Sequence, residues 1–280
     1  MQPRGRREPM SIVLARQGVL VIACLITLLP IVFLYLNTFK SLEEFFNDPY
    51  GLPPAWRFDN YLRAWTEANV AGTLTNSLIA TGGGVLLNLA LAVPASYALA
   101  RFALRLRFTI YLVFVGGMVV PAQLIVLPLL LVMRDLKLIG SPLSLICAYA
   151  ALSLPMSVLF LTSFFATIPA EIEEAARVDG AGPLRVLLAI VLPLARPGIA
   201  AVVILAGVWM WNDFIVALIL ATRPSIHTLP VGIMSFFGVY STEWTLAFAS
   251  VAIAATPFLL AYLALTRQFI AGLSVGAVRG

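Results

Sequence analysis

The sequence predicts an all-α integral membrane protein with six transmembrane helices. Of the 280 residues, 61% are apolar and only 11% are charged, and long apolar runs recur along the whole chain. A soluble domain has about 45–50% apolar and about 25% charged residues, and a water-soluble fold of this length could not hide so much apolar surface. The runs are continuous rather than alternating, and an open sheet cannot satisfy its backbone in lipid, so we expect helices rather than strands.

Six segments are long enough and apolar enough to span a bilayer, which requires about 20 mostly apolar residues. We expect these helices at residues 18–39, 74–100, 108–132, 143–165, 198–221 and 246–266. Residues 1–72 then hold the N-terminus, the first helix and an external loop. Residues 73–267 hold the other five helices with an internal loop at 166–197, and residues 268–280 form a C-terminal tail.

The basic residues set the expected orientation of these helices. With the N-terminus inside, 12 of the 18 Lys and Arg residues lie in internal segments and 6 in external ones, which favours cytoplasmic termini. Arg4, Arg6, Arg7 and Arg16 precede the first apolar run, as they would in a signal peptide. That run is too long for a signal core and no cleavage site follows it, so we expect a retained helix.

The remaining charged and reactive residues exclude other classes of protein. The net charge of +5 does not indicate nucleic-acid binding, because the basic residues are scattered singly between apolar runs. Cys24 and Cys147 lie within apolar runs, and His227 is the only histidine. We therefore expect neither a structural disulfide nor a metal site.

Two local patterns predict further structure. In the external loop, Phe58, Tyr61, Leu62 and Trp65 share one helical face, which predicts a short helix at the membrane interface. The second span contains three consecutive glycines at 82–84 followed by several alanines. Small side chains let helix backbones approach closely in lipid, so we expect this helix inside a bundle.

The internal loop at 166–197 has the pattern of a helix, a tight turn and a second helix. Pro169 suits the first turn of a helix, and Gly180 suits a left-handed cap at its end. Gly182-Pro183 then begins a second helix, which Pro193 interrupts. Three carboxylates complement the positive N-terminal end of the first helix, namely those of Glu171, Glu173 and Glu174.

The first of these helices carries an apolar patch within a charged rim. Ala175 and Ala176 form the patch, and the carboxylates with Arg177 form the rim. This surface suits docking into a groove of a soluble partner, and it equally suits an ordinary solvated loop helix. The residue pattern alone does not decide between the two.

A family resemblance favours the docking interpretation. Glu174-Ala175-Ala176, Gly180 and then Ile190, Leu192 and Pro193 resemble the EAA loop of permease subunits of binding-protein-dependent ATP-binding-cassette (ABC) importers. In that family the first helix of the loop is the coupling helix, which docks into a cleft of the ATP-hydrolysing subunit. The resemblance therefore implies that ATPase coupling depends on Glu174, Ala175, Ala176, Asp179, Gly180, Ile190, Leu192 and Pro193.

Three further segments are similar to the carbohydrate branch of this family, the maltose-type inner-membrane permeases. They are Trp211-Asn212-Asp213, the run from Tyr97 to Phe102, and the tail at 269–280. The resemblance implies a sugar importer in a bacterial or archaeal cytoplasmic membrane. It also implies a second homologous permease, two ATPase subunits that bind ATP and Mg²⁺, and an external solute-binding protein. The chain itself would break no bond and hold no cofactor.

The expected path of the substrate is less sharply defined. Polar groups within spans are expensive and often line a water-filled path, which makes candidates of Gln123, Tyr149, Trp211, Asn212 and Asp213. Alternatively, the amides hydrogen-bond between helices and Asp213 satisfies a neighbouring backbone group or cation.

Three other functions compete with that of a sugar importer. A permease for glycerol phosphate or another polar solute fits the same motifs. An ion-coupled secondary transporter is disfavoured, since Asp213 is the single clear intramembrane acid and no internal repeat is visible. A membrane enzyme lacks a constellation of residues for acid–base or metal chemistry.

Overall fold

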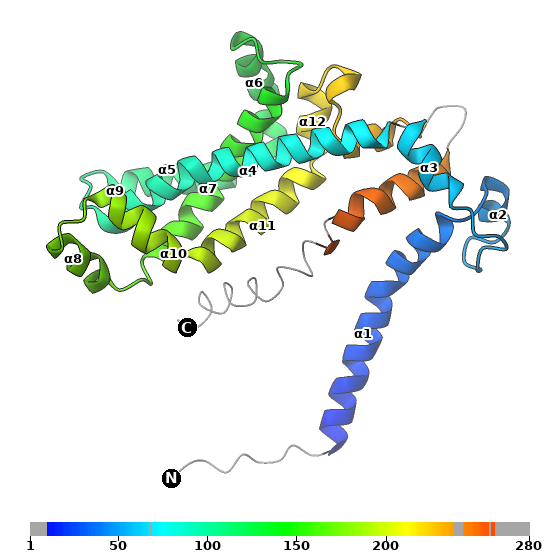
Figure 1. Cartoon of the computed structure of the whole chain (residues 1–280), viewed down its shortest axis with the longest axis horizontal. Helices are drawn as coiled ribbons and strands as arrows, with labels where there is room; N and C mark the ends of the chain where they lie inside the picture. The colour runs from blue at the N-terminus through cyan, green and yellow to red at the C-terminus, as the bar shows by residue number, and fades with distance from the viewer. Residues whose placement is uncertain (1–9, 68, 238–242, 258, 261–280) are drawn as a thin grey trace. The chain divides into compact units, whose positions relative to one another are not determined.

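The computed structural model describes residues 10–67, 69–237, 243–257, 259 and 260 (Figure 1). Every regular element in these ranges is a helix, so the all-α prediction is confirmed. Contacts divide the chain into two compact units, Met1–Ala68 with Phe236–Ala255, and Asn69–Ser235 with Thr256–Gly280. The first division lies close to the predicted boundary at 72/73. Contacts group Phe236–Ala255, which includes the start of the predicted sixth span, with the N-terminal unit rather than with the other four later helices.

The N-terminal unit begins with the long apolar helix α1. It spans Met10–Asn37, so it begins eight residues before the predicted 18–39. Two short helices follow, α2 at Leu42–Asn47 and α3 at Asp59–Thr66. The predicted short helix is therefore present as α3, and the Phe58, Leu62 and Trp65 side chains in and next to it are exposed.

A buried polar network holds the turn between α1 and α2. The Lys40 ammonium, which is fully buried, donates to the carbonyl of Asp48 over 2.7 Å. The Asn60 amide donates to the carbonyls of Thr38 and Lys40 at 2.8 and 2.9 Å. At the start of α2, Ser41 and Glu44 form a reciprocal capping box. These bonds fix α3 against the end of α1.

A helix at Trp244–Pro257, unlabelled and orange in Figure 1, packs within the N-terminal unit through aromatic rings. Phe248 makes edge contacts with Phe33 and Phe45 at centroid distances of 6.0 and 5.2 Å. This helix begins two residues before the predicted sixth span at 246–266. Residues 261–266 of that span, and the predicted tail at 268–280, lie outside the described residues.

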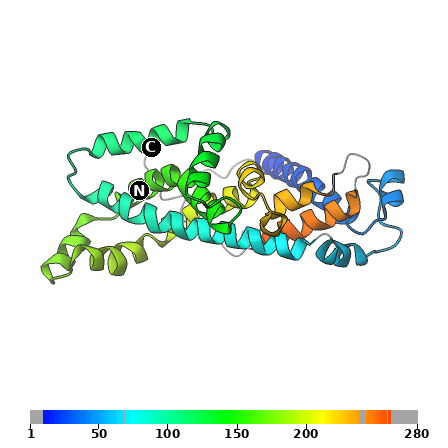
Figure 2. The same ribbon diagram turned by 90° about the horizontal axis from the view of Figure 1, so that it is seen from above.

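The second unit is built on three helices that pack along one another, as Figures 1 and 2 show. They are α4 at Val70–Arg101, α7 at Pro142–Phe165 and α11 at Arg196–Asn212. A Cβ atom on Gly84 of α4 would lie 2.9 Å from the Met210 sulfur and 3.1 Å from Cβ of Tyr149. The backbones meet this closely because glycine has no side chain, which confirms that α4 lies inside the bundle.

The remaining elements of this unit are shorter. They are α5 at Arg107–Val119, α6 at Ala122–Asp135, α8 at Ala170–Val178, α9 at Pro183–Val186, the π-helical η1 at Leu187–Val191, α10 at Leu192–Leu194, α12 at Ile215–Leu220, the 3-10 helix η2 at Pro224–Ile226 and α13 at Leu229–Met234. Helix α5 packs on α7, α12 packs on α6 and α7, and η2 and α13 pack on α4.

The predicted span at 108–132 is not one helix. Helices α5 and α6 meet at an angle of 107° across Val120 and Pro121. The proline ring disfavours a helical conformation in the residue before it, and Val120 accordingly has ψ 119°. The predicted span is therefore broken at Pro121, and it remains a single span only if this bent pair is counted as one.

The predicted span at 198–221 is also divided. Helix α11 ends at Asn212, and α12 begins at Ile215 after an extended Asp213 with ψ 129°. Among the described residues, three helices are long and apolar enough to cross a membrane. The count rises to five if two bent pairs each count as one span, namely Arg107–Val119 with Gln123–Asp135 and Pro183–Leu194 with Arg196–Asn212. The predicted count of six is not reached in this part of the chain.

Candidate functional site

The internal loop forms the predicted helix–turn–helix. Helix α8 follows Pro169, which occupies the cap position one residue before the first turn, and Glu171 and Glu173 lie in that turn. At the other end, Gly180 has φ +85°, so the predicted left-handed cap is confirmed. Its N–H donates to the carbonyl of Arg177 at 3.0 Å, and the N–H of Ala181 donates to that of Ala176 at 2.9 Å. This pair of bonds is a Schellman motif.

Glu173 lies on the inner face of α8 and binds the end of α4. Its side chain is 2% exposed. The Arg101 Nε donates to Glu173 Oε1 over 2.6 Å, and the Tyr97 hydroxyl donates to Oε2 over 2.8 Å. Tyr97 and Arg101 are four residues apart and therefore share one face of α4. The expectation that Glu173 belongs to a solvated charged rim is therefore wrong.

Two further contacts support this attachment. Arg101 Nη2 also donates to the carbonyl of Ile168 over 2.7 Å, just before α8 begins. Arg177 Nη2 lies 3.6 Å from Glu173 Oε2. Removing one partner of such a buried, hydrogen-bonded pair typically costs about 3–5 kcal/mol, because the other charge is left uncompensated. The loop is thus anchored to α4 by charge-assisted bonds as well as by its covalent link to α7.

The outer face of α8 is exposed and partly apolar. Ile172, Ala175 and Val178 recur every three residues, and Val178 is 87% exposed. Glu171 and Glu174 are exposed beside them. Four predicted coupling residues are therefore accessible, namely Glu174, Ala175, Asp179 and Gly180, whereas Ala176 is half-buried against the core cluster that contains Phe165 and Val186.

The return toward the bundle contains a π turn. The N–H of Leu192 donates to the carbonyl of Leu187, five residues earlier. Pro193 was expected to interrupt the second helix, but the chain stays helical through Leu194 and bends by 77° before Arg196. A π turn redirects the local hydrogen bonds, so the missing N–H of proline is accommodated without a break. Ile190 and Leu192 are half-buried and Pro193 is exposed.

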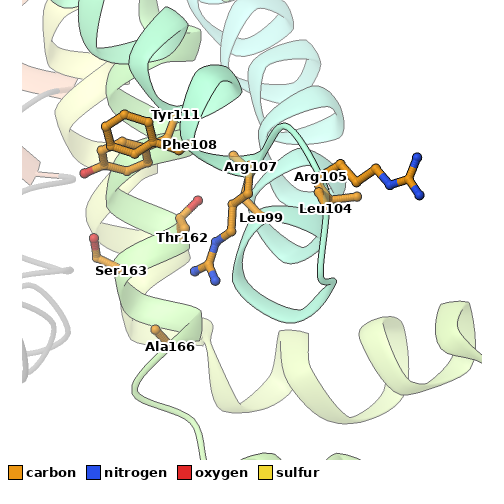
Figure 3. A pocket seen from close by; sticks show the side chains of 9 residues that line it. All are labelled: Leu99, Leu104, Arg105, Arg107, Phe108, Tyr111, Thr162, Ser163 and Ala166. Carbon is orange, nitrogen blue, oxygen red and sulfur yellow. The ribbon is translucent and has the colours of Figure 1, made fainter.

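A cavity of about 530 Å³ lies where the turn between α4 and α5 faces α7. Figure 3 shows the Arg107 side chain extending toward Thr162 and Ser163 of α7, while Arg105 points away. Sequence reasoning did not identify this cavity, because its walls come from segments about sixty residues apart. Its positive charge favours an anionic group.

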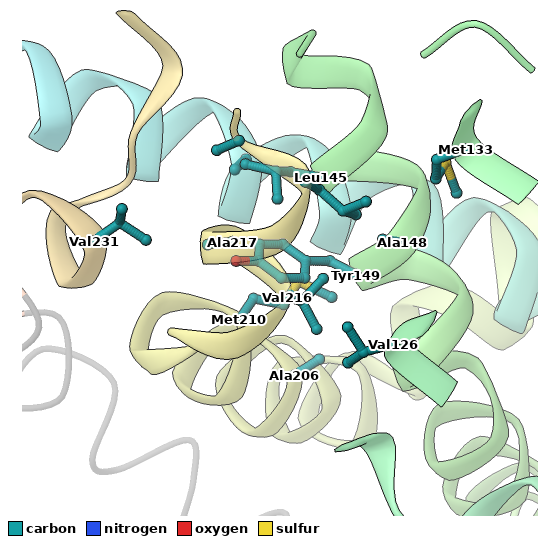
Figure 4. Packing of buried hydrophobic residues seen from close by; sticks show 13 residues of the cluster. Val126, Met133, Leu145, Ala148, Tyr149, Ala206, Met210, Val216, Ala217 and Val231 are labelled. Carbon is teal, nitrogen blue, oxygen red and sulfur yellow. The ribbon is translucent and has the colours of Figure 1, made fainter. Parts of the chain in front are cut away.

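The candidate path residues lie around the two helix breaks. Tyr149 is fully buried, and its hydroxyl donates to Asp213 Oδ2 over 3.1 Å. The same oxygen accepts from the N–H of Ala217 at 3.0 Å and so caps α12. In Figure 4 the Tyr149 ring lies among apolar side chains from α6, α11 and α12, including those of Val126 and Val216. Asp213 therefore satisfies a neighbouring backbone group, as the alternative interpretation expected.

The other three path candidates differ in their burial. Trp211 is only 8% exposed, and the Asn212 amide donates to the carbonyl of Val208 within its own helix. Gln123 is exposed in the first turn of α6. The structure adds Trp209, which is 37% exposed and contacts the Tyr149 ring edge-on at 5.8 Å.

Comparison with known proteins identifies the family. Residues 92–275, which include the whole loop and both helix breaks, match the family described as binding-protein-dependent transport system inner membrane component. The chain belongs to this family. It is therefore a multi-pass membrane protein that serves as a transport subunit and not as an enzyme.

Relatives of this inner membrane component match along most of its length. The diacetylchitobiose uptake system permease protein NgcG of Streptomyces coelicolor is 34% identical over 264 residues, which cover 94% of this chain and 87% of that protein. The melibiose/raffinose/stachyose import permease protein MelC of Bacillus subtilis is 31% identical over 249 residues, which cover 89% and 90%.

Solved structures show the same fold. A crystal structure of a bacterial ABC transporter involved in the import of the acidic polysaccharide alginate contains a chain with a TM-score of 0.83 at 24% identity, covering 96% of this chain and 100% of that one. A chain of the MetNI methionine ABC transporter gives 0.55 at 15% identity, covering 72% and 95%. This inner membrane component thus has the fold of an ABC importer permease.

Proposed function

We propose that this permease couples sugar import to ATP hydrolysis by docking α8 against an ATPase subunit. The observation that carries the proposal is the two-sided character of α8. Its inner face is fixed to α4 through Glu173, while Ile172, Ala175 and Val178 are exposed on its outer face. A rigid helix with an exposed apolar stripe and acidic neighbours suits a groove in a soluble partner.

The proposed assembly contains four kinds of subunit. This permease pairs with a second, homologous permease, and each contributes half of the translocation pathway. Two ATPase subunits bind ATP and Mg²⁺ on the cytoplasmic side, and an external solute-binding protein delivers the substrate. Both termini then lie in the cytoplasm, in agreement with the 12 basic residues in internal segments against 6 in external ones, out of 18.

A sugar or oligosaccharide is the proposed substrate class. Support comes from the names of the relatives, which specify diacetylchitobiose for one and melibiose, raffinose and stachyose for another. The second candidate class is a polar glycerol conjugate, which is supported by the name of another relative, a sulfoquinovosyl glycerol transport system permease protein. Glycerol phosphate, another polar solute of this kind, belongs to the same second class.

We place the proposed path beside the two helix breaks. Non-helical backbone at membrane depth is tolerated where it is buried in protein or lines a water-filled cavity. Both breaks lie near the Tyr149 cluster, since α6 and α12 contribute Val126 and Val216 to it. The proposed path residues are Gln123, Tyr149, Trp211, Asn212 and Asp213.

The test is purification of the tagged permease from native membranes in mild detergent, with mass spectrometry of the proteins that accompany it. We expect an ATPase and a second permease. Ala175→Arg should abolish recovery of the ATPase, whereas Ala170→Arg, the same change at an exposed position elsewhere on α8, should not. Recovery of the permease alone, or of the ATPase with both variants equally, would refute docking through α8.

Uptake measurements in inverted and right-side-out vesicles separate the substrate classes. Saturable, ATP-dependent uptake of a labelled disaccharide that is suppressed by excess oligosaccharide supports the sugar assignment. Suppression by a glycerol conjugate or glycerol phosphate, but not by oligosaccharide, supports the second class instead. Uptake driven by an ion gradient without ATP would overturn the importer assignment itself.

A further inference from the structure

Two adjacent carboxylates of α8 have opposite surroundings. Glu173 is buried and bonded to Tyr97 and Arg101 of α4, whereas Glu174 is exposed. We propose that Glu173 is a positioning residue for energy coupling, which fixes α8 to the end of α4 so that both helices move as one piece. This inference rests on the proposed docking of α8 and assigns the transmission of its movement to a residue outside the Glu174-Ala175-Ala176 motif.

The attachment resists both sliding and rotation of α8. Arg101 binds α8 itself through Glu173 Oε1 at 2.6 Å and the turn before α8 through the carbonyl of Ile168 at 2.7 Å. The Tyr97 hydroxyl holds the second oxygen of Glu173 at 2.8 Å. Bonds to an ionised group are shorter and roughly twice as strong as neutral ones. Because two donors come from successive turns of α4, neither helix can turn without breaking one of them.

Burial protects this attachment from competition by water. Tyr97 is 4% exposed, and the Arg101 and Glu173 side chains are 12% and 2% exposed. The Arg177 guanidinium, at 3.6 Å on α8 itself, faces the same carboxylate from the more exposed side. Exposed ion pairs contribute little because water and salt screen them, whereas a buried, fully hydrogen-bonded pair holds one geometry.

Helix α4 extends from this attachment to the candidate path. Gly84 lies 13 residues before Tyr97, which corresponds to about 20 Å along a helix with a rise of about 1.5 Å per residue. There α4 touches Met210 and Tyr149, the residue that holds Asp213. A displacement of α8 that is passed to α4 therefore reaches the break between α11 and α12 through close-packed contacts.

The experiment compares Glu173→Gln with Glu171→Gln in the complete importer, reconstituted in liposomes with its binding protein and substrate. We expect Glu173→Gln to keep the ATPase bound, while substrate transported per ATP hydrolysed falls roughly 2- to 30-fold, the usual range for mutations that weaken coupling between sites. Glu171→Gln, the same change at an exposed carboxylate of α8 outside the predicted coupling residues, should leave this ratio unchanged. Tyr97→Phe, which removes one hydroxyl and keeps the ring, should give a smaller fall in the ratio.

A distance measurement tests the same inference independently of activity. Spin labels at Val178→Cys on α8 and Leu86→Cys on α4, both exposed positions, are introduced after Cys24 and Cys147 are replaced by serine. We expect one narrow distance distribution with and without nucleotide, and a broad one when Glu173 is replaced by glutamine.

Two results would overturn the proposal. One is an unchanged transport ratio and an unchanged distance distribution in Glu173→Gln, and the other is loss of the bound ATPase in that variant. The second result would show that Glu173 only shapes the docking face. Failure of the proposed function can be distinguished from both results, because no ATPase would then be recovered with the unaltered permease.

Discussion

Gly180 ends α8 in a left-handed conformation, and replacing it with alanine isolates the effect of that conformation. Its φ is +85°, and a Cβ atom built on it meets no atom within 4 Å. Gly182, two residues later, also has open space around its Cβ position but has φ −70°. Gly180→Ala and Gly182→Ala thus introduce the same methyl group into equally open space, and only the first strains the backbone.

The expected magnitude follows from the backbone alone. An L-residue other than glycine in the left-handed region costs about 1–2 kcal/mol, which corresponds to a factor of about 5–30 in an equilibrium constant. At φ −70° alanine is unstrained, and it stabilises by about 0.4–1 kcal/mol through the unfolded chain. The two variants should therefore differ in sign as well as in size.

Hydrogen exchange of the purified permease, followed by mass spectrometry of peptides covering 175–186, measures this difference. The N–H of Ala181, which donates to Ala176 in the Schellman motif, should exchange about 5–30 times faster in Gly180→Ala. Gly182→Ala should exchange at the original rate or more slowly. Equal rates in the two variants would refute the argument from φ. The bulkier Gly180→Val should also abolish uptake while the protein still inserts into the membrane.

Three further outcomes are expected. Gly84→Val should lower the midpoint of thermal unfolding in detergent, because overpacking costs about 1–3 kcal/mol. Gly82→Val should not lower it, because the Cβ position of Gly82 lies in open space. Equal midpoints in the two variants would contradict the packing of α4. Trp209→Ala should reduce sugar uptake at unchanged expression, because its exposed indole is the one that can contact substrate. Trp211→Ala should instead lower the stability of the protein, because that indole is buried. The reverse pattern would exchange their roles. The backbone N–H of Ser41 and then the Arg57 guanidinium hold the pKa of Glu44 below its ordinary value of 4.5. The stabilising contribution of Glu44 is therefore complete above about pH 4.5, and it is lost as the pH falls through the lowered pKa. Exchange protection of α2 should therefore decline in acid, and a Glu44→Gln variant should lack this decline.

Features determined by local chemistry could be predicted from the sequence. The apolar runs predicted helices, the glycines at 82–84 predicted that α4 lies inside the bundle, and Gly180 predicted the end of α8. The angle at Pro121 could not be predicted, because prolines are tolerated in transmembrane helices and the apolar run continues across it. A hydropathy pattern therefore does not distinguish a kink from a bend of 107°.

The role of Glu173 could not be read from the loop itself. Glu171, Glu173 and Glu174 have the same side chain within one helical turn, and only a partner elsewhere in the chain distinguishes them. A signal was nevertheless present, since Tyr97 and Arg101 are spaced by four residues at the end of an apolar helix. Likewise, Trp209 and Trp211 differ only in the face of α11 on which they lie.

The bend between α5 and α6 has a consequence for water. Helix α5 has 13 residues, and about 20 Å of helix cannot cross roughly 30 Å of hydrocarbon. At the bend, the last carbonyls of α5 and the first N–H groups of α6 lose their partners within the helices. Lipid tails offer no hydrogen bonds, so in the assembled transporter these backbone groups must face protein or water. Solvent entering the membrane at this point would have a hydrogen-bonding surface made of main chain rather than of side chains.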